Sequence, residues 1–160
     1  MKRKPAVPVP AEPSSPLERI DTSYLESLLG YNARRTALTV ISVFLRRMEP
    51  FGLRPVDFSV LTLVAHNPGI TSRQICSALD ILPPNLVGMV KAFERRGLLE
   101  RRPHPTDRRA HGLHLTPAGA LLQAEAQQTA SELEKDAASR LTLAEQKTLI
   151  RLLRKVYLPD

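Results

Sequence analysis

The sequence predicts a mainly α-helical chain with a small β-hairpin, and three observations support this fold class. Apolar residues recur at helical spacing through most of the chain after residue 20. Capping residues and Gly or Pro stops divide this pattern into separate helices. Residues 100–115 instead contain two short strand-like stretches around a turn rich in Pro and Arg, which is typical of paired strands.

The composition limits the possible partners and compartments. The 160 residues suffice for one domain, and the formal charge of +7 favours polyanions, with nucleic acid ahead of anionic membrane. A single cysteine excludes an internal disulfide framework and the common zinc patterns, so we expect a cytoplasmic protein without a metal. No apolar run approaches the roughly 18 residues that span a bilayer, so no membrane partner is expected.

Residues 1–20 are predicted to form a flexible, Pro-rich basic leader. The start, Met1-Lys2-Arg3-Lys4, resembles the beginning of an export signal, but prolines follow where an apolar segment should stand. This leader is either a basic arm that reaches along DNA or a segment with no assigned role. Residues 21–160 are expected to form a single domain.

The terminal helices have more apolar surface than one small domain can cover. The first, expected over about 23–49, is capped by Asp21, Thr22 or Ser23 and is apolar on two sides. Two more helices are expected within 117–157: one runs to about Leu141, and a capping box of Thr142 and Glu145 opens the other. We therefore predict a helical dimerisation layer formed by these N- and C-terminal helices, and a homodimer.

Between these helices, residues 55–116 have the pattern of a helix-turn-helix followed by a hairpin. Three helices are expected: from Pro55 or Asp57 to about Asn67, from Ser72 to Leu79, and from Pro84 to Arg96. Thr71 and Gln74 form a capping box for the second, and Gly97 ends the third.

The helix from Pro84 to Arg96 has the two faces of a DNA-reading helix. Its core face is expected to consist of Leu86, Met89, Val90 and Phe93. The opposite face and the helix start carry the residues expected in a major groove: Pro84, Asn85, Val87, Gly88, Lys91 and Arg95. Asn85 can contact adenine, whereas Lys91 and Arg95 suit phosphates. Gly88, which costs about 1 kcal/mol against Ala in a helix, either permits close approach to DNA or is merely tolerated.

The hairpin concentrates positive charge, with seven basic and three acidic residues between Lys91 and His114. Arginines on a protruding ribbon repel one another unless an anion lies between them, and a narrow minor groove supplies that negative potential. Asp107 can orient Arg109 through a bidentate pair. The hairpin residues expected to contact DNA are Arg101, Arg102, Thr106, Asp107, Arg108 and Arg109.

The segments Leu98–Pro103, Asp107–Ala110 and Leu113–Gly119 together resemble the wing signature of MarR-type winged helix-turn-helix regulators. The resemblance extends back through residues 67–71, 83–84 and 29–31. It implies a homodimeric transcription factor, usually a repressor, that binds a palindromic double-stranded operator and often releases it when a small aromatic or phenolic ligand binds. It also implies that Arg109 enters the minor groove, that Asp107 holds it, and that residues 84–95 lie in the major groove. Val87 and Gly88 depart from the polar or basic residues common there.

The resemblance further implies an effector pocket between the dimerisation layer and the winged domain. The polar or aromatic residues expected to line it are Tyr31, Arg34, Arg35 and His66. Some members of the family sense oxidants through a cysteine near the start of the first helix, where this chain has none. Cys76 is expected to be a small core residue. No cofactor is expected.

Two other classes of function were compared with a DNA-binding regulator. An enzyme is not expected, because the sequence contains no glycine-framed nucleophile, phosphate loop or His-rich metal spacing. The alternative is a winged-helix module that binds proteins, or DNA nonspecifically, without responding to a ligand. Steep salt dependence combined with preference for one duplex sequence would separate these functions.

Overall fold

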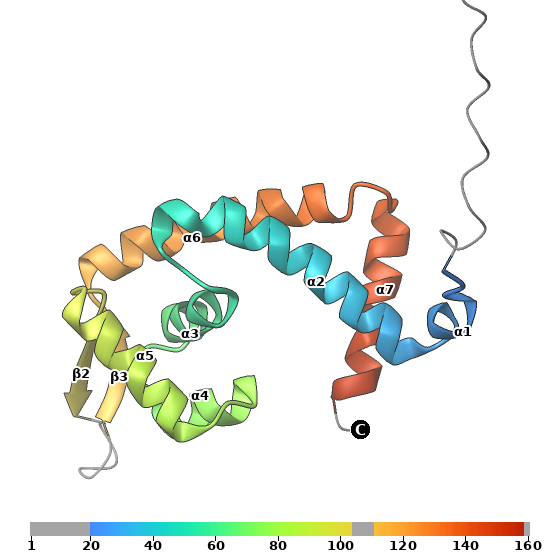
Figure 1. The fold of residues 1–160 in the computed structure, drawn as a ribbon. Helices are drawn as coiled ribbons and strands as arrows, with labels where there is room; N and C mark the ends of the chain where they lie inside the picture. Colours follow the sequence, from blue (N-terminus) through green and yellow to red (C-terminus); the bar gives the residue numbers. More distant parts are fainter. Residues whose placement is uncertain (1–19, 104–110, 159–160) are drawn as a thin grey trace, which may run out of the picture. The chain divides into compact units, whose positions relative to one another are not determined.

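A computed structural model describes residues 20–103 and 111–158, and its ribbon is drawn in Figure 1. The chain divides into two compact units, Met1–Thr36 and Ala37–Asp160. The helices are α1 (Ser23–Glu26), α2 (Leu29–Met48), α3 (Pro55–His66), α4 (Ser72–Leu79), α5 (Pro83–Arg95), α6 (Pro117–Ala137) and α7 (Leu143–Tyr157), with a 3₁₀ turn, η2 (Glu49–Phe51), after α2. Almost all of the predicted leader lies outside the described residues.

The predicted continuous helix over residues 23–49 is broken into α1 and α2. The Ser27 hydroxyl donates to the Tyr24 carbonyl at 2.7 Å. The Asn32 side-chain amide donates to the carbonyl oxygens of Glu26 at 2.7 Å and Leu28 at 2.8 Å. These polar side chains satisfy backbone acceptors at the break, a local effect that apolar spacing does not reveal.

The boundaries of the other helices differ from the predictions by a few residues. Helix α5 begins at Pro83, one residue earlier than expected, because Leu82 takes the extended N-cap conformation. Both predicted capping boxes are present, at Thr71 and at Thr142. Helix α6 ends at Ala137, four residues before the expected Leu141, and the chain turns there before Thr142 caps α7.

The hairpin strands β2 (Leu99–Pro103) and β3 (His111–Leu115) pair antiparallel, as predicted, with Leu99 opposite Leu115. A third strand that the sequence did not predict, β1 (Ile70–Thr71), adds to β3 and gives the order β1-β3-β2. It is too short for an alternating pattern. Gly112 permits this pairing, because a Cβ there would lie 2.6 Å from the Gly69 carbonyl oxygen.

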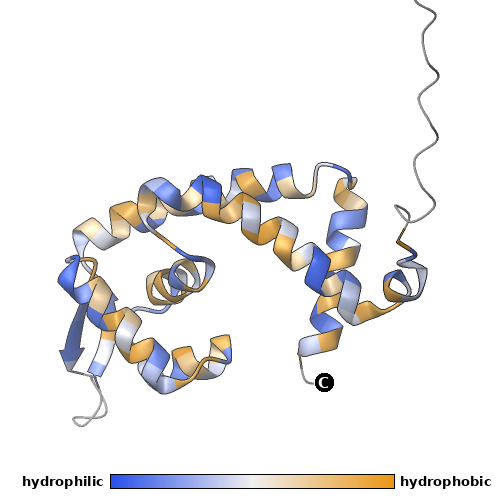
Figure 2. Cartoon of the chain, in the orientation of Figure 1, coloured by the Kyte–Doolittle hydropathy of each residue, from blue (hydrophilic) through white to orange (hydrophobic). Residues whose placement is uncertain are grey.

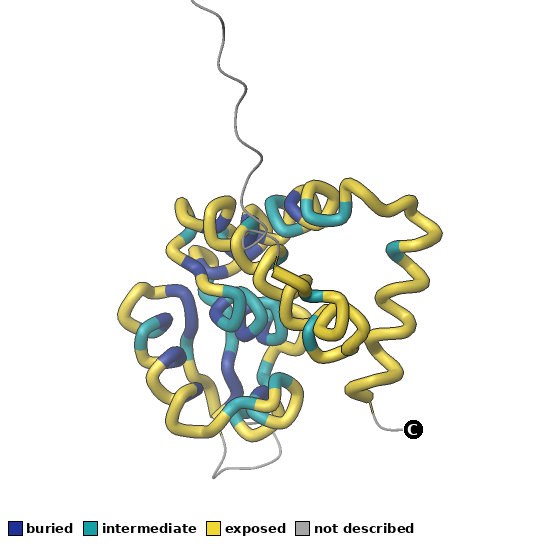
Figure 3. Tube along the Cα trace, turned by 45° about the vertical axis from the view of Figure 1, so that its right-hand side comes forward, coloured by how far each residue is buried: buried dark blue, intermediate teal, exposed yellow. Residues whose placement is uncertain are grey.

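One apolar core lies within the second unit and receives side chains from α2, α3, α4, α5, the hairpin and α6; Figure 3 shows these buried segments in dark blue. The predicted core face of α5 is confirmed: Leu86, Met89, Val90 and Phe93 are all buried. Cys76 is half-buried and packs against this core.

The junction between the hairpin and α6 is fixed by close backbone contacts. A Cβ at Gly119 would lie 2.0 Å from the Leu98 carbonyl oxygen, so only glycine fits where α6 begins. The Thr116 hydroxyl donates to the Gly97 carbonyl at 2.6 Å, and the Gly119 backbone N–H donates to the same hydroxyl at 3.0 Å. These two hydrogen bonds connect Gly97, which follows α5, to Thr116, which caps α6.

Helix α7 has apolar residues but buries none of them within the described part of the chain. Orange apolar positions alternate with blue polar ones along it in Figure 2. The large apolar side chains that it exposes are Leu143, Leu149, Ile150, Leu152, Leu153, Val156 and Tyr157. This is the surplus apolar surface that the sequence predicted. Among the described residues, no helix is long and apolar enough to cross a membrane.

Candidate nucleic-acid interface

The exposed face of α5 carries all six residues that the sequence assigned to the major groove. Each of them is exposed, whereas the core face of the same helix is buried. A Cβ at Gly88 would meet no atom within 4 Å, so packing does not explain the glycine. The structure therefore brings the predicted groove-reading residues together on one helix. Their contacts with DNA remain a prediction.

The turn between α4 and α5 sets the direction in which α5 leaves the core. Asp80 has a left-handed backbone with φ of 49°, which aspartate tolerates better than most residues. The Ile81 backbone N–H donates to the Cys76 carbonyl at 3.2 Å, and Leu82 is extended before the Pro83 start. A helix-turn-helix thus forms from a short polar turn and a proline-initiated helix.

Arg96 connects the end of α5 to the turn that follows α2. Its guanidinium donates to the carbonyl oxygens of Phe51 at 2.8 Å and Gly52 at 3.3 Å. Gly52 itself has a left-handed backbone with φ of 59°. The sequence indicated Arg96 only as part of the basic cluster and did not predict this positioning contact. The sequence feature that could have indicated this contact is a basic residue at the C-terminus of a helix.

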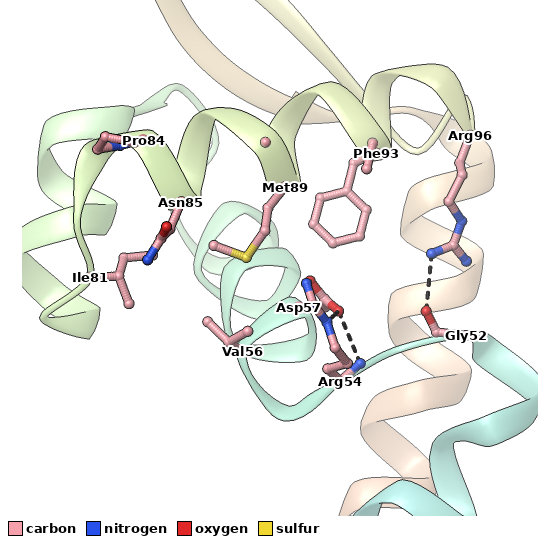
Figure 4. A pocket seen from close by; sticks show the side chains of 12 residues that line it. Gly52, Arg54, Val56, Asp57, Ile81, Pro84, Asn85, Met89, Phe93 and Arg96 are labelled. Carbon is pink, nitrogen blue, oxygen red and sulfur yellow. Dashed lines mark hydrogen bonds and ion pairs between the residues drawn. The ribbon is translucent and has the colours of Figure 1, made fainter.

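A hollow of about 800 Å³ lies beside the start of α5 (Figure 4). Pro84, Asn85 and Gly88 line it together with an ion pair from the start of α3. In that pair, Arg54 Nε lies 2.7 Å from Asp57 Oδ2, and the Arg54 backbone N–H donates to the same oxygen at 3.1 Å. This carboxylate raises the pKa of Arg54, chiefly through the side-chain hydrogen bond.

Arg54 is therefore a cation held by Asp57 beside α5, a position that the sequence pattern did not predict. In the sequence, positive charge is concentrated in the hairpin, which lies far along the chain from residue 54. The signal in the sequence is the Arg54-Pro55 pair before Asp57, where Asp57 caps the helix start and holds the arginine. Asn85 and Arg54 line one hollow and together offer an amide and a guanidinium to a polyanion.

In the wing, formed by β2 and β3, the two described arginines each have an acidic partner. Arg101 Nε lies 2.7 Å from Glu94 Oε1, which joins β2 to α5. Arg102 Nε lies 3.0 Å from Glu100 Oε1. Neighbouring positions on a strand point to opposite faces, so the two guanidinium groups do not form one continuous basic row. Repulsion among the hairpin arginines is thus weaker than the sequence suggested, because carboxylates lie beside two of them.

The tip of the wing lies outside the described residues. Thr106, Asp107, Arg108 and Arg109 all fall within residues 104–110. The predicted pairing of Asp107 with Arg109, and the entry of Arg109 into a minor groove, therefore remain predictions.

The four residues expected to line an effector pocket belong to different units. Tyr31, Arg34 and Arg35 lie on α2 within the first unit, and Tyr31 is half-buried there. His66 lies at the end of α3 in the second unit, where it is exposed and lines a groove with residues of α6 and β3. A shared pocket for all four remains a prediction. Among the described residues, no cluster of three His, Cys, Asp or Glu side chains could hold a metal.

Comparisons with known proteins match most of the chain. A model of the MarR family matches residues 51–110. Over 133 residues the chain is 34% identical to the putative transcriptional regulatory protein for the hcr operon of Thauera aromatica, which covers 82% of this chain and 80% of that protein.

Two solved structures of CouR also resemble the chain. The transcriptional repressor CouR bound to a 23-mer DNA duplex matches with a TM-score of 0.82 and 36% identity, over 88% of this chain and 99% of that one. CouR bound to p-coumaroyl-CoA matches with a TM-score of 0.79 and 34% identity, over 89% of this chain and all of that one. The similarity thus extends well beyond the 60 residues of the family model, over most of the chain. Fold, wing strands and relatives agree, and the chain belongs to the MarR family of DNA-binding transcriptional regulators.

Proposed function

We propose that this protein is a homodimeric repressor that binds a palindromic double-stranded operator and releases it when a small aromatic or phenolic ligand binds. The observation that carries this proposal is the exposed face of α5 with an antiparallel wing beside it. Six groove-facing residues lie on α5, and Arg101 connects the wing to that helix through Glu94. The polar and basic groups of this face suit a DNA groove and its phosphates.

The docking geometry follows from the size of the duplex. In a dimer, the two copies of α5 would enter successive major grooves about one duplex turn, roughly 34 Å, apart. Asn85 would read a base edge, while Lys91 and Arg95 would contact phosphates. The wing tip, with Arg109, would reach the flanking minor groove, where the potential is most negative.

The dimer is supported by apolar surface that the described chain leaves uncovered. Helix α7 exposes side chains such as Leu152 and Val156, with 48% and 66% of their surfaces accessible. In α2, Leu38, Ile41 and Leu45 are likewise exposed. Several large apolar side chains exposed along one helix are typical of an interface. A second copy of the chain would cover it and would also place two DNA-binding faces on one particle.

Repression and its release are inferred from CouR. CouR is a transcriptional repressor whose solved structures contain a DNA duplex in one case and p-coumaroyl-CoA in another. A ligand that binds better to the DNA-free state weakens operator binding by the ratio of its two affinities. We extend this linkage to an aromatic or phenolic effector of the present protein.

A salt-series binding assay tests this function. Purified protein is titrated against the promoter DNA upstream of its own gene and against a scrambled duplex of equal length. We expect tight binding to the promoter with a steep loss of affinity as salt rises, because phosphate contacts release counterions. The scrambled duplex should bind at least about 1,000-fold more weakly. Equal, weak binding to both duplexes would instead indicate a nonspecific or protein-binding module.

A further inference from the structure

The hollow beside the start of α5 is lined by one flank of that helix and by the start of α3 (Figure 4). Pro84, Asn85 and Gly88 belong both to this lining and to the exposed face expected in the major groove. All of the residues that line the hollow belong to the second unit. The hollow is therefore continuous with the proposed DNA-binding face.

The hollow and the wing lie on opposite flanks of α5. Ala92 lines the hollow, whereas Glu94, two residues later, holds Arg101 of the wing. Successive residues of a helix are about 100° apart, so these two positions are roughly 200° apart around α5. A helix with its side chains nearly fills a major groove, which is roughly 12 Å wide. Each flank of a helix in the groove therefore faces one of the two phosphate backbones.

Arg54 is the cation that the hollow presents to solvent. Its side chain is 68% exposed, whereas that of its partner Asp57 is 11% exposed. The ion pair therefore turns its guanidinium outward and its carboxylate toward the protein. Asp57 accepts from Nε of Arg54 at 2.7 Å and from Nη2 at 3.1 Å. These contacts use two of the five N–H groups of the guanidinium and leave its opposite edge for a second acceptor.

Arg96, the other arginine that lines the hollow, holds the backbone that precedes Arg54. It donates to the carbonyl oxygens of Phe51 and Gly52, and so connects this segment to the end of α5. The backbone before Arg54 is thus held by Arg96, and the Arg54 guanidinium is held by Asp57. A side chain that is already ordered loses less conformational entropy when it binds an anion.

We propose that Arg54 binds a phosphate of the operator backbone, on the flank of α5 that faces away from the wing. The phosphate lies at the mouth of the hollow, and the guanidinium donates to it from the edge that Asp57 does not use. Such a charge-assisted contact fixes position and does not depend on base sequence. Arg54 would thus set how α5 sits in the groove while α5 reads the bases. This assignment rests on the proposed binding of an operator by α5.

Operator titrations of the full-length protein at several salt concentrations test the contact. Arg54→Gln should weaken binding at least about tenfold, the lower end for a hydrogen bond to a charged group. The slope of log affinity against log salt should fall by about one per protomer, as for one lost phosphate contact. Because most of the side chain is exposed and glutamine keeps a donor for Asp57, the variant should fold, which urea unfolding checks.

Arg140→Gln is the matched control for the lost charge. Arg140 is exposed and does not line the hollow, so this variant should keep the affinity and the salt slope of the wild type. A loss of affinity in Arg54→Gln without a change in slope would mean that Arg54 only supports α3, and would overturn the contact.

Neutral methylphosphonates, placed one at a time along the operator, locate the phosphate. In the wild type we expect one position in each half-site where the substitution weakens binding and where Arg54→Gln no longer responds. This loss of response is expected because the two changes remove the same interaction. An identical set of sensitive positions in both proteins would overturn the assignment.

The outcomes separate this inference from the proposed function. If the wild type selects its promoter and Arg54→Gln binds it with equal affinity and salt slope, the contact at Arg54 is overturned and operator binding stands. If the wild type binds promoter and scrambled duplex equally, the proposed function is contradicted, and this assignment with it.

Discussion

Gly119 and Gly88 both lie within helices, yet only Gly119 touches another segment. A Cβ at position 119 would lie 2.0 Å from the Leu98 carbonyl oxygen, a backbone atom that cannot move aside cheaply. Gly119→Ala should therefore destabilise the fold by about 3 kcal/mol or more, at the upper end of overpacking effects. Urea unfolding measures this change. Unaltered stability would show that the junction between the wing and α6 is looser than the structure indicates.

Gly88→Ala should have the opposite effect on stability. The position is exposed and has open space around it, so alanine should stabilise α5 by up to about 1 kcal/mol. Since nothing within the protein explains this glycine, we expect the variant to bind the operator more weakly, because the added methyl group obstructs close approach to DNA. Operator titration of a variant confirmed to be at least as stable as the wild type tests this. Unchanged affinity would mean that Gly88 is merely tolerated.

Arg109 is expected to contribute most to wing binding. Arg109→Ala should weaken operator binding by about tenfold or more, as expected for loss of a groove contact worth roughly 1–3 kcal/mol. Fluorescence anisotropy measures the affinity, and light scattering should show an unaltered oligomeric state. Arg140→Ala, an exposed arginine in the turn after α6, serves as the control for lost charge. If the two variants bind equally well, the wing does not contribute as proposed.

At the scale of the element, the N-terminal cap of α7 makes the stability of this helix depend on pH. Glu145 accepts from the Thr142 backbone N–H at 2.8 Å and from its hydroxyl at 2.7 Å. These hydrogen bonds, the backbone one first, lower the pKa of Glu145 below its ordinary 4.5. Because the pKa of Glu145 is lower in the folded protein than in the unfolded chain, its ionised cap stabilises the fold fully above about pH 4.5. This stabilisation is lost as the pH falls through the folded-state pKa of Glu145.

Glu145→Gln should remove this dependence, because glutamine keeps a capping acceptor but does not titrate. Unfolding curves recorded between about pH 6 and pH 3 should show a smaller loss of stability in the variant than in the wild type. Glu125→Gln, an exposed carboxylate on α6, controls for the change in net charge. An equal acid response in all three proteins would mean that the cap does not stabilise α7.

At the scale of the whole molecule, the uncovered apolar surface is expected to hold two chains together. Leu152→Glu places a charge on the apolar stripe of α7, and burying that charge unpaired would be costly. We expect the dimer to dissociate at concentrations where the wild type does not, and operator affinity to fall with it. Light scattering and operator titration measure both. Lys147→Glu lies opposite the stripe on the same helix and should leave the dimer intact; if both variants remain dimeric, α7 is not at the interface.

Several features of the fold could be predicted because they depend on neighbours in the sequence. The core face of α5 follows from the 3.6-residue period, and the capping boxes at Thr71 and Thr142 follow from residues three positions apart. The hairpin strands were predicted by the same kind of local pattern. The break after Glu26 was not, because it depends on hydrogen bonds of Asn32 and Ser27 that apolar spacing does not encode.

The sequence by itself determined the class of this protein: separate capped helices, a helix α5 with one buried and one exposed face, a basic hairpin and more apolar surface than one chain can cover. Only the tertiary structure decided which distant groups meet. It paired β1 with β3 across Gly112 and placed Arg54 beside α5. The physical reason is the separation along the chain over which each effect acts. Periodicity and capping act over a few residues, whereas these contacts join segments more than thirty residues apart that only packing of the core brings together.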